Sequence, residues 1–403
     1  MTLAFNAGHG GCDGSMRIDE QHALLDRFQR HLDNDTTDFA CSSLRVPAEH
    51  YTDDAQTAAE VDALFLRRPL LVAMSADLPK PGDYLCHDLL ETPLILVRGT
   101  DNEIRAFINA CRHRGARIAE GRGNAASFMC PYHAWNYSLD GNVRSRPNAC
   151  GGFDDAGDDF GRLTEVACHE VAGLVFVLMQ GDDIESQIRA TMGPAIDEIA
   201  TYPLASCEYF DGREGVQPCN YKFIVDGFAE AYHIAALHKD TIRPYFYATP
   251  ALTDTLGSVA RMIGVRRSVD KEFDKPAAER RLLPHGTTQY LFAPNVVLSW
   301  QGDHMECWRV YPVQGKADEC RMVVDHYWPG PFDDEVRRKA EFNLNLLWDV
   351  TTGEDMVQSR AIHRNLASGA APDMVFGRNE PALIHYHKQI AQAIGSDKLT
   401  ELG

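Results

Sequence analysis

Short apolar runs, broken at close intervals by Gly, Pro and Asp, occupy the chain between residues 70 and 138. Runs of this length, separated by turn residues, are typical of strands in an antiparallel sheet. The pattern therefore predicts a small β module. Its expected strands are 70–73, 84–89, 92–98, 104–109, 126–129 and 135–138.

Helical periodicity precedes this module. Leu24, Leu25, Phe28 and Leu32 recur near the spacing of one helix face, which predicts an amphipathic helix over 19–32. The same reasoning predicts a helix over 54–66. Residues 1–17 are Gly-rich and aperiodic, and we expect a mobile arm there.

After the β module we expect a second domain, which contains both strands and helices. Runs at 163–166 and 173–179 are typical of strands leading into it, and residues 184–199 of a helix. Further strands are expected at 290–292, 296–300, 305–312 and 321–328, and helices around 220–240, 333–362 and 376–393. This order predicts an α+β domain whose antiparallel sheet and helices enclose a pocket.

Length and charge exclude several classes of protein. The 403 residues suffice for two domains, and the longest apolar runs, such as 171–179, are far shorter than a membrane span. A formal charge of −19 argues against nucleic acid or an anionic membrane as partner. Eleven cysteines without regular spacing argue against a disulfide framework. We expect a soluble, cytoplasmic protein.

Two pairs of metal-ligating residues lie within the β module. Cys111 and His113 form the first pair, and Cys130 and His133 form the second, with sixteen residues between the pairs. Two cysteines and two histidines are the ligands of a Rieske [2Fe–2S] centre. A structural zinc site is the alternative, but zinc fingers usually pair like residues, whereas each pair here holds one Cys and one His.

The residues after Cys130 carry a family resemblance. The run to Gly141 is similar to C-P-Y-H-G-W-x-Y-x-x-D-G of Rieske-type ring-hydroxylating oxygenases, with Ala134 where Gly is usual. Respiratory-chain Rieske subunits carry two further cysteines that join the cluster loops. Ala116 and Tyr132 stand at those places here, which favours the oxygenase and ferredoxin type.

The stretch 220–238 resembles a second signature of the same family, N-W-K-x-x-x-[DE]-N-x-x-[DE]-x-Y-H-x-x-x-x-H. The resemblance implies that His233 and His238 bind a mononuclear iron. It also implies that Glu230 links the two metal centres, alone or with help from Asp226. Five residues along an α-helix turn by about 500°, so an undistorted helix would hold the two histidines about 140° apart. We therefore expect the helix to end or bulge within 234–237.

The third iron ligand is expected from a downstream acid. Two imidazoles and one carboxylate form the facial triad of non-haem Fe(II) oxygenases. The family's carboxylate lies in a run similar to E-D-x-x-x-x-x-x-Q/R, which residues 351–360 resemble, and Asp355 is the expected ligand. Glu354 and Asp349 are the alternatives.

Other residues near these motifs remain open to two interpretations. Gly227 and Phe228 flank the proposed iron ligands and are candidate pocket residues, although Phe228 also suits a hydrophobic core. Five arginines and one acid lie within 105–122, and Arg144 and Arg146 follow. This basic island could dock an acidic electron donor, or its arginines could make structural hydrogen bonds.

We expect an α+β chain with an N-terminal arm and helix (1–43), a Rieske domain (44–165) and a catalytic mononuclear iron domain (166–403). The catalytic domain should have the helix-grip, START-like architecture that the resemblance implies. A Rieske histidine, His133, would pass electrons to Glu230 and His233 of a neighbouring subunit, which implies a trimer.

The resemblance implies a terminal oxygenase component that uses O2 to hydroxylate a small organic substrate, aromatic or cyclic, as in aromatic hydrocarbon catabolism. Electrons would come from NAD(P)H through a flavin reductase or ferredoxin. Oxidative N- or O-demethylation and quaternary-amine monooxygenation are the alternatives within the family. Outside it stand a Rieske-type electron carrier and a zinc-binding module.

Overall fold

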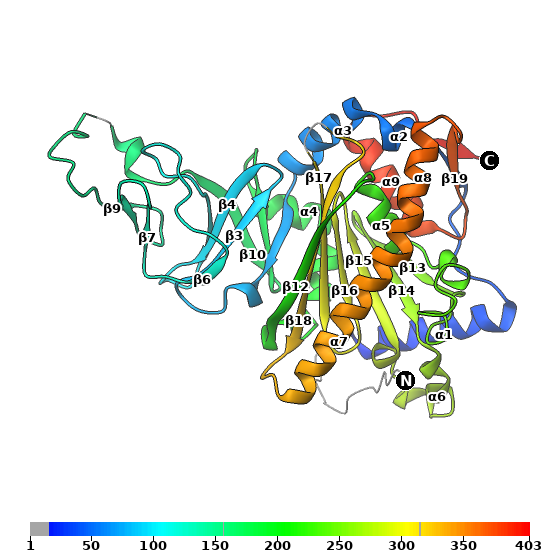
Figure 1. Ribbon diagram of the computed structural model, residues 1–403. Helices are drawn as coiled ribbons and strands as arrows, with labels where there is room; N and C mark the ends of the chain where they lie inside the picture. The colour runs from blue at the N-terminus through cyan, green and yellow to red at the C-terminus, as the bar shows by residue number, and fades with distance from the viewer. Residues whose placement is uncertain (1–15, 156, 314–315) are drawn as a thin grey trace. The chain divides into compact units, whose positions relative to one another are not determined.

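The computed structural model describes residues 16–155, 157–313 and 316–403 (Figure 1). The arm expected at residues 1–17 lies almost entirely outside the described residues. The chain forms two compact units. One unit is Phe65–Ile188, and the other joins the residues up to Leu64 with Arg189–Gly403.

The Phe65–Ile188 unit is built on an antiparallel seven-stranded sheet. Its strand order is β2 (Leu70–Met74), β11 (Leu174–Leu178), β10 (Glu165–Val171), β5 (Ile104–Ile108), β4 (Thr92–Arg98), β3 (Asp83–Leu89) and β6 (Arg122–Asn124). All five residues of β2 and of β11 are buried. Four of the six strands expected in the β module, 70–73, 84–89, 92–98 and 104–109, are thus present in this sheet.

A second, three-stranded sheet of this unit carries one of the expected metal loops. It consists of β7 (Phe128–Met129), β8 (Asn136–Tyr137) and β9 (Val143–Ser145). Phe128 and Tyr137 belong to a hydrophobic cluster that also contains Phe107 of β5, Cys111 and Cys130. One core therefore supports both expected cluster loops.

The other unit contains a seven-stranded antiparallel sheet. Its strand order is β12 (Cys207–Gln217), β18 (Cys320–Pro329), β17 (Met305–Pro312), β16 (Val296–Trp300), β15 (Gly286–Phe292), β14 (Val259–Val265) and β13 (Leu252–Leu256). Every residue of β16 and β17 is buried. The α+β architecture expected from the sequence is confirmed.

Long helices accompany this sheet. Asp333 caps α7 (Asp334–Val350) by accepting hydrogen bonds from the backbone of Glu335 and Val336. A π-helical segment, Thr351–Asp355, joins α7 to α8 (Met356–Ala367), and the three segments run across the sheet in Figure 1. The other helices are α1 (Ile18–Asn34), α2 (Glu49–Thr52), α3 (Asp54–Glu60), α4 (Ile184–Ile199), α5 (Lys222–Phe228), α6 (Asp270–Phe273) and α9 (Pro381–Ala393). Among the described residues, no helix is both long and apolar enough to cross a membrane.

The compact units divide the chain at other residues than the expected domains. Strand β1 (Ser43–Pro47) pairs with β19 (Asp373–Phe376) and β20 (Thr400–Leu402), so the residues after 43 fold with the C-terminal part of the chain. Strands β10 and β11 pair with β5 and β2, so they complete the first sheet instead of leading into the second unit. Backbone pairing between distant segments sets both boundaries.

Candidate active site

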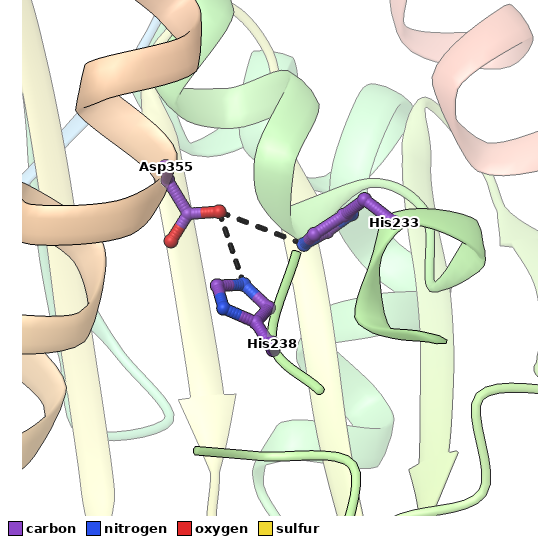
Figure 2. A group of neighbouring side chains, drawn as sticks. All are labelled: His233, His238 and Asp355. Atoms are coloured by element: carbon purple, nitrogen blue, oxygen red, sulfur yellow. Dashed lines mark ion pairs between the residues drawn. The ribbon is translucent and has the colours of Figure 1, made fainter. Parts of the chain in front are cut away.

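Three side chains expected to bind iron lie together in the structure (Figure 2). The Oδ1 atom of Asp355 lies 3.6 Å from Nε2 of His233 and 3.1 Å from Nε2 of His238. All three potential ligand atoms lie within 4.8 Å of one another. Two imidazoles and one carboxylate therefore converge from two separate chain segments.

The local backbone brings the two histidines onto one side. Helix α5 ends at Phe228, and His233 lies in a 3₁₀ turn, Tyr232–Ala235. His238 follows in a further turn, where its carbonyl accepts hydrogen bonds from the backbone of residues 241–243. The expected interruption of the helix is confirmed, and it allows both rings to reach one point.

The π-helical segment Thr351–Asp355 positions the acids. Single π turns within α-helices are frequently found at functional sites. Here the segment directs two consecutive acids to the same imidazole, because Glu354 contacts Nδ1 of His238 and Asp355 contacts Nε2. Asp349, the other alternative for the third ligand, is exposed on α7.

A glutamate contacts the Nδ1 atom of each histidine, on the side of the ring away from Asp355. Nδ1 of His233 contacts Glu230, and Nδ1 of His238 lies 2.7 Å from Oε2 of Glu354. A carboxylate can only accept, so each Nδ1 carries the proton and each Nε2 is left with a lone pair facing Asp355. This is the arrangement found behind metal-binding histidines. The residues therefore fit a mononuclear iron.

The carboxylates also perturb the protonation of His238. Burial lowers the pKa of its imidazole, but the neighbouring carboxylates of Asp355 and Glu354 outweigh burial and raise the pKa above its ordinary value. Glu354 additionally accepts a 3.0 Å hydrogen bond from the hydroxyl of Thr241. The acids thus supply negative charge that favours a cation at this point.

Asp226 lies apart from the three converging ligand atoms. Its carboxylate accepts from the Tyr51 hydroxyl at 2.6 Å and contacts Nε2 of His387 at 2.8 Å. His387 in turn contacts His50 at 3.0 Å. The contacts of Asp226 are therefore with a buried polar network.

A cavity of about 1400 Å³ adjoins the three ligands. Gly227 and Phe228 both line it, as expected, and Phe228 also packs on Trp308 with ring centroids 5.0 Å apart. A Cβ built on Gly227 would have Oδ1 of Asp355 at 4.0 Å as its nearest neighbour, so the glycine leaves open space beside the site. The wall also includes Gln289 and Trp300, which the sequence did not single out.

The two expected cluster loops share one backbone pattern. Cys111 donates its N–H to the carbonyl of Ala116, and its carbonyl accepts from Gly115. Cys130 likewise donates to Trp135 and accepts from Ala134. Gly115 and Ala134 occupy equivalent positions with φ of 76° and 54°, so Ala134 adopts the left-handed conformation for which Gly is the usual residue.

The side chains of these loops fit a Rieske cluster. The rings of His113 and His133 have centroids 4.5 Å apart, and Nδ1 of His113 is buried without a hydrogen-bond partner. Both cysteines are buried and belong to no disulfide. The Tyr137 hydroxyl accepts from the backbone N–H of Arg112 at 3.0 Å, so its own proton is available to Sγ of Cys111 at 3.2 Å.

Most arginines of the basic island have partners within the chain. Arg105 pairs with Asp101 at 2.5 Å, Arg117 with Asp88 at 2.9 Å and Arg122 with Asp77 at 3.1 Å. Arg112 contacts the hydroxyl of Thr164 at 3.1 Å, and Arg114 lies over the ring of Tyr132. These contacts support the structural interpretation for the first three arginines.

Comparisons with known proteins identify the families to which the two parts of the chain are similar. The family described as Rieske [2Fe-2S] domain matches residues 68–153, and the ring hydroxylating alpha subunit (catalytic domain) matches residues 204–396. The glycine betaine monooxygenase oxygenase subunit of Chromohalobacter salexigens is 27% identical over 81% of this chain and 80% of its own. The biphenyl 2,3-dioxygenase subunit alpha of Rhodococcus jostii is 31% identical over 68% of this chain and 58% of its own.

A similar fold is found among solved structures. A quaternary ammonium Rieske monooxygenase in complex with L-carnitine superposes with a TM-score of 0.74 at 21% identity, covering 88% of this chain and 96% of its own. The chain belongs to the family of Rieske oxygenase alpha subunits. It is therefore an oxidoreductase with a Rieske [2Fe–2S] domain and a catalytic non-haem iron domain.

Proposed function

We propose that His233, His238 and Asp355 hold the mononuclear iron, and that Cys111, His113, Cys130 and His133 hold the Rieske cluster. The convergence of the three iron-site donors beside the 1400 Å³ cavity carries this proposal. An iron held by two imidazoles and one carboxylate keeps positions open for O2. In this scheme Glu230 and Glu354 fix the rings of His233 and His238.

The substrate we propose is a small quaternary amine that also bears a carboxylate, and the reaction is its monooxygenation. The glycine betaine relative, which matches along most of both chains, supports this class. The cavity supports it physically. Gln289 and Trp300 line the cavity, and Oε1 of Gln289 and Nε1 of Trp300 are buried without hydrogen-bond partners. A hydrocarbon would leave both atoms unpaired, at a cost of about 1–3 kcal/mol each.

Aromatic ring hydroxylation is the second candidate. The biphenyl dioxygenase relative favours it, and apolar side chains such as Phe228, Ile224 and Leu347 line part of the same cavity. The ring of Trp300 suits both candidates, because an aromatic face attracts a quaternary ammonium as well as another ring. Substrate-dependent O2 uptake with a surrogate reductase separates the two.

The assay compares glycine betaine, carnitine and biphenyl, with product formation and peroxide release measured together. We expect uptake coupled to product with a quaternary amine, and none with biphenyl. Coupled oxidation of biphenyl alone would replace the first candidate by the second. The control is the Asp355→Ala variant, which should keep its Rieske absorption. Any O2 uptake that remains in this variant does not arise at the mononuclear iron.

We further propose a homotrimer in which His133 of one subunit faces Glu230 of the next. Large apolar side chains are exposed beside both ends of this electron path. Met129 and Tyr132 near the cluster are 61% and 58% exposed, and Tyr232 next to His233 is 70% exposed. A neighbouring subunit would cover them. Sedimentation should give the mass of a trimer, and a monomeric enzyme with full activity would contradict the path.

Electrons would reach the cluster from a ferredoxin or flavin reductase in the cytoplasm. Among the arginines of the basic island, Arg114 is exposed and lies over the exposed ring of Tyr132. Arg114→Glu should slow reduction of the cluster and weaken its salt dependence. An unchanged rate would exclude docking at this residue. Arg117→Glu serves as the control, because Arg117 is paired with Asp88.

A further inference from the structure

A second convergence of two histidines and one carboxylate lies in the sheet of the catalytic unit. His304 directly precedes β17, Glu306 lies within β17, and His326 lies opposite Glu306 on β18. The potential ligand atoms of the three residues lie within 4.8 Å of one another. All three side chains are at most 5% exposed. None of them belongs to the iron site proposed above.

The sheet explains why the three side chains meet. His304 and Glu306 are two residues apart, which places them on the same face of an extended segment. Residues directly opposite on neighbouring antiparallel strands have adjacent side chains, which adds His326 to that face. The rings of His304 and His326 have centroids 5.4 Å apart. The convergence thus follows from strand register.

His304 is oriented as a ligand would be. Its Nδ1 lies 2.6 Å from Oδ1 of Asp303, so this nitrogen donates and Nε2 carries the lone pair. Lys339 pairs with the same aspartate, and the imidazole stacks on Trp328 with centroids 4.0 Å apart and planes 6° from parallel. A carboxylate behind a histidine and a fixed ring are features of metal sites.

The inner nitrogens have no hydrogen-bond partner in the structure. This holds for Nε2 of His304 and for both ring nitrogens of His326. Glu306 directs Oε1 towards them, at 3.4 Å from Nε2 of His304 and 3.9 Å from Nε2 of His326, while its Oε2 accepts from Gln301 at 3.0 Å. Leaving a buried polar atom unpaired costs about 1–3 kcal/mol. A bound ion would satisfy one such nitrogen of each ring at once.

We propose that His304, Glu306 and His326 form a second metal site, for a divalent cation of the zinc type. Two imidazoles and one carboxylate are a known zinc ligand set. Zinc–nitrogen distances of about 2.0–2.1 Å in tetrahedral geometry put ligand atoms about 3.3 Å apart. Oε1 of Glu306 and Nε2 of His304, 3.4 Å apart, are already near this separation. Oε1 of Glu306 and Nε2 of His326, 3.9 Å apart, would have to approach by about 0.6 Å.

The site borders the same cavity as the iron ligands, because His304 and Glu306 line it. An ion held there would place positive charge on the cavity wall and would attract an anionic group such as a carboxylate. The metal site itself does not depend on the substrate proposed above. It rests only on the donor atoms and their burial.

Zinc binding to the holoenzyme tests the site. The protein is dialysed with ZnSO4, freed of loose metal by gel filtration, and analysed for zinc and iron, and a competing chelator then gives the affinity. We expect about one zinc per chain with the iron content unchanged. His326→Gln and Glu306→Gln should lower zinc affinity at least tenfold. His363→Gln is the matched control, because it changes another buried histidine whose Nδ1 lacks a partner.

Two outcomes of the binding experiment would overturn the proposal. One is zinc at background level in the wild type. The other is zinc that persists in His326→Gln but disappears in His233→Gln, which would place it at the iron site. Retained mononuclear iron and an unchanged circular dichroism spectrum show that a variant has folded, because the Rieske cluster lies in the other compact unit. If neither variant folds, X-ray absorption at the zinc edge of the wild type decides: two imidazoles and oxygen support the site, and sulfur ligation contradicts it.

Discussion

Replacing Glu354 removes the carboxylate that holds the imidazole of His238, and we expect iron affinity to fall in a graded series. Oε2 of Glu354 lies 2.7 Å from Nδ1 of His238, and the side chain is 27% exposed. Glu354→Gln keeps the size of the side chain and an oxygen that still accepts from Nδ1. Glu354→Ala removes the acceptor entirely.

The expected losses follow from the kind of hydrogen bond. A bond to a charged group contributes about 1.5–3 kcal/mol and a neutral one about 0.5–1.5 kcal/mol, so Glu354→Gln should cost about 1 kcal/mol, or about fivefold in iron affinity. Loss of such a supporting carboxylate lowers metal affinity about 10–100-fold, so Glu354→Ala should cost about 1.4–2.7 kcal/mol.

The assay is competition for Fe(II) by a chelator of known affinity, under anaerobic conditions, with circular dichroism monitoring the fold. Asp355→Ala should lose the mononuclear iron altogether. Asp349→Ala, which changes an exposed acid on α7, should leave the affinity unchanged. These two variants bracket the series.

Two results would refute this reasoning. If Glu354→Ala bound iron as tightly as the wild type, the carboxylate would not support His238 in the way the structure indicates. If Glu354→Ala lost iron completely while Asp355→Ala retained it, Glu354 would be the ligand and Asp355 the supporting acid.

Three further predictions concern stability, redox potential and pH. Lys222 and Glu60 form a fully buried ion pair at 2.7 Å. In denaturant titration, Lys222→Met should therefore lower the free energy of unfolding by about 3–5 kcal/mol. The control is Lys316→Met, which changes an exposed ion pair and should alter the free energy of unfolding by less than about 1 kcal/mol. Tyr137→Phe removes a donor to the Cys111 sulfur and should lower the cluster potential by about 20–60 mV in a spectroscopic titration; an unchanged potential would mean that the hydroxyl does not donate there. Burial and nearby Lys222 and His387 hold the pKa of His50 well below 6.5, so the unfolded chain takes up this proton first, and stability is lost as pH falls below 6.5. His50→Gln should therefore reduce the change in unfolding free energy between pH 7.5 and 5.5, and an equal slope in both proteins would contradict this.

The sequence predicted the elements that local patterns define. Helix α4 was expected at 184–199 and is found at Ile184–Ile199, and strands β3, β4 and β16 lie at or within one residue of their expected bounds. Apolar periodicity and turn residues act within a few positions, so one segment suffices to read them. The spacing of His233 and His238 likewise predicted the break between them, because helix geometry is local.

Features that depend on distant segments escaped prediction. Strand β1 contributes to a sheet only through β19 and β20, more than three hundred residues later in the chain. The π turn that directs both Glu354 and Asp355 to His238 has no clear sequence signal, and Glu354 was considered only as a possible ligand. His304 and Glu306 are two residues apart in the sequence, the spacing of side chains on one face of a strand. That His326 lies beside them could not be predicted, because it depends on the register between β17 and β18.

Metal analysis of the wild type and of Asp355→Ala tests the central claim most directly. A terminal oxygenase should contain the two irons and two sulfides of its cluster together with one further iron. Asp355→Ala should keep the cluster with its absorption and lose only the further iron, along with substrate-dependent O2 uptake. A wild type with cluster iron alone, or an Asp355→Ala variant that keeps the further iron and its activity, would contradict the account.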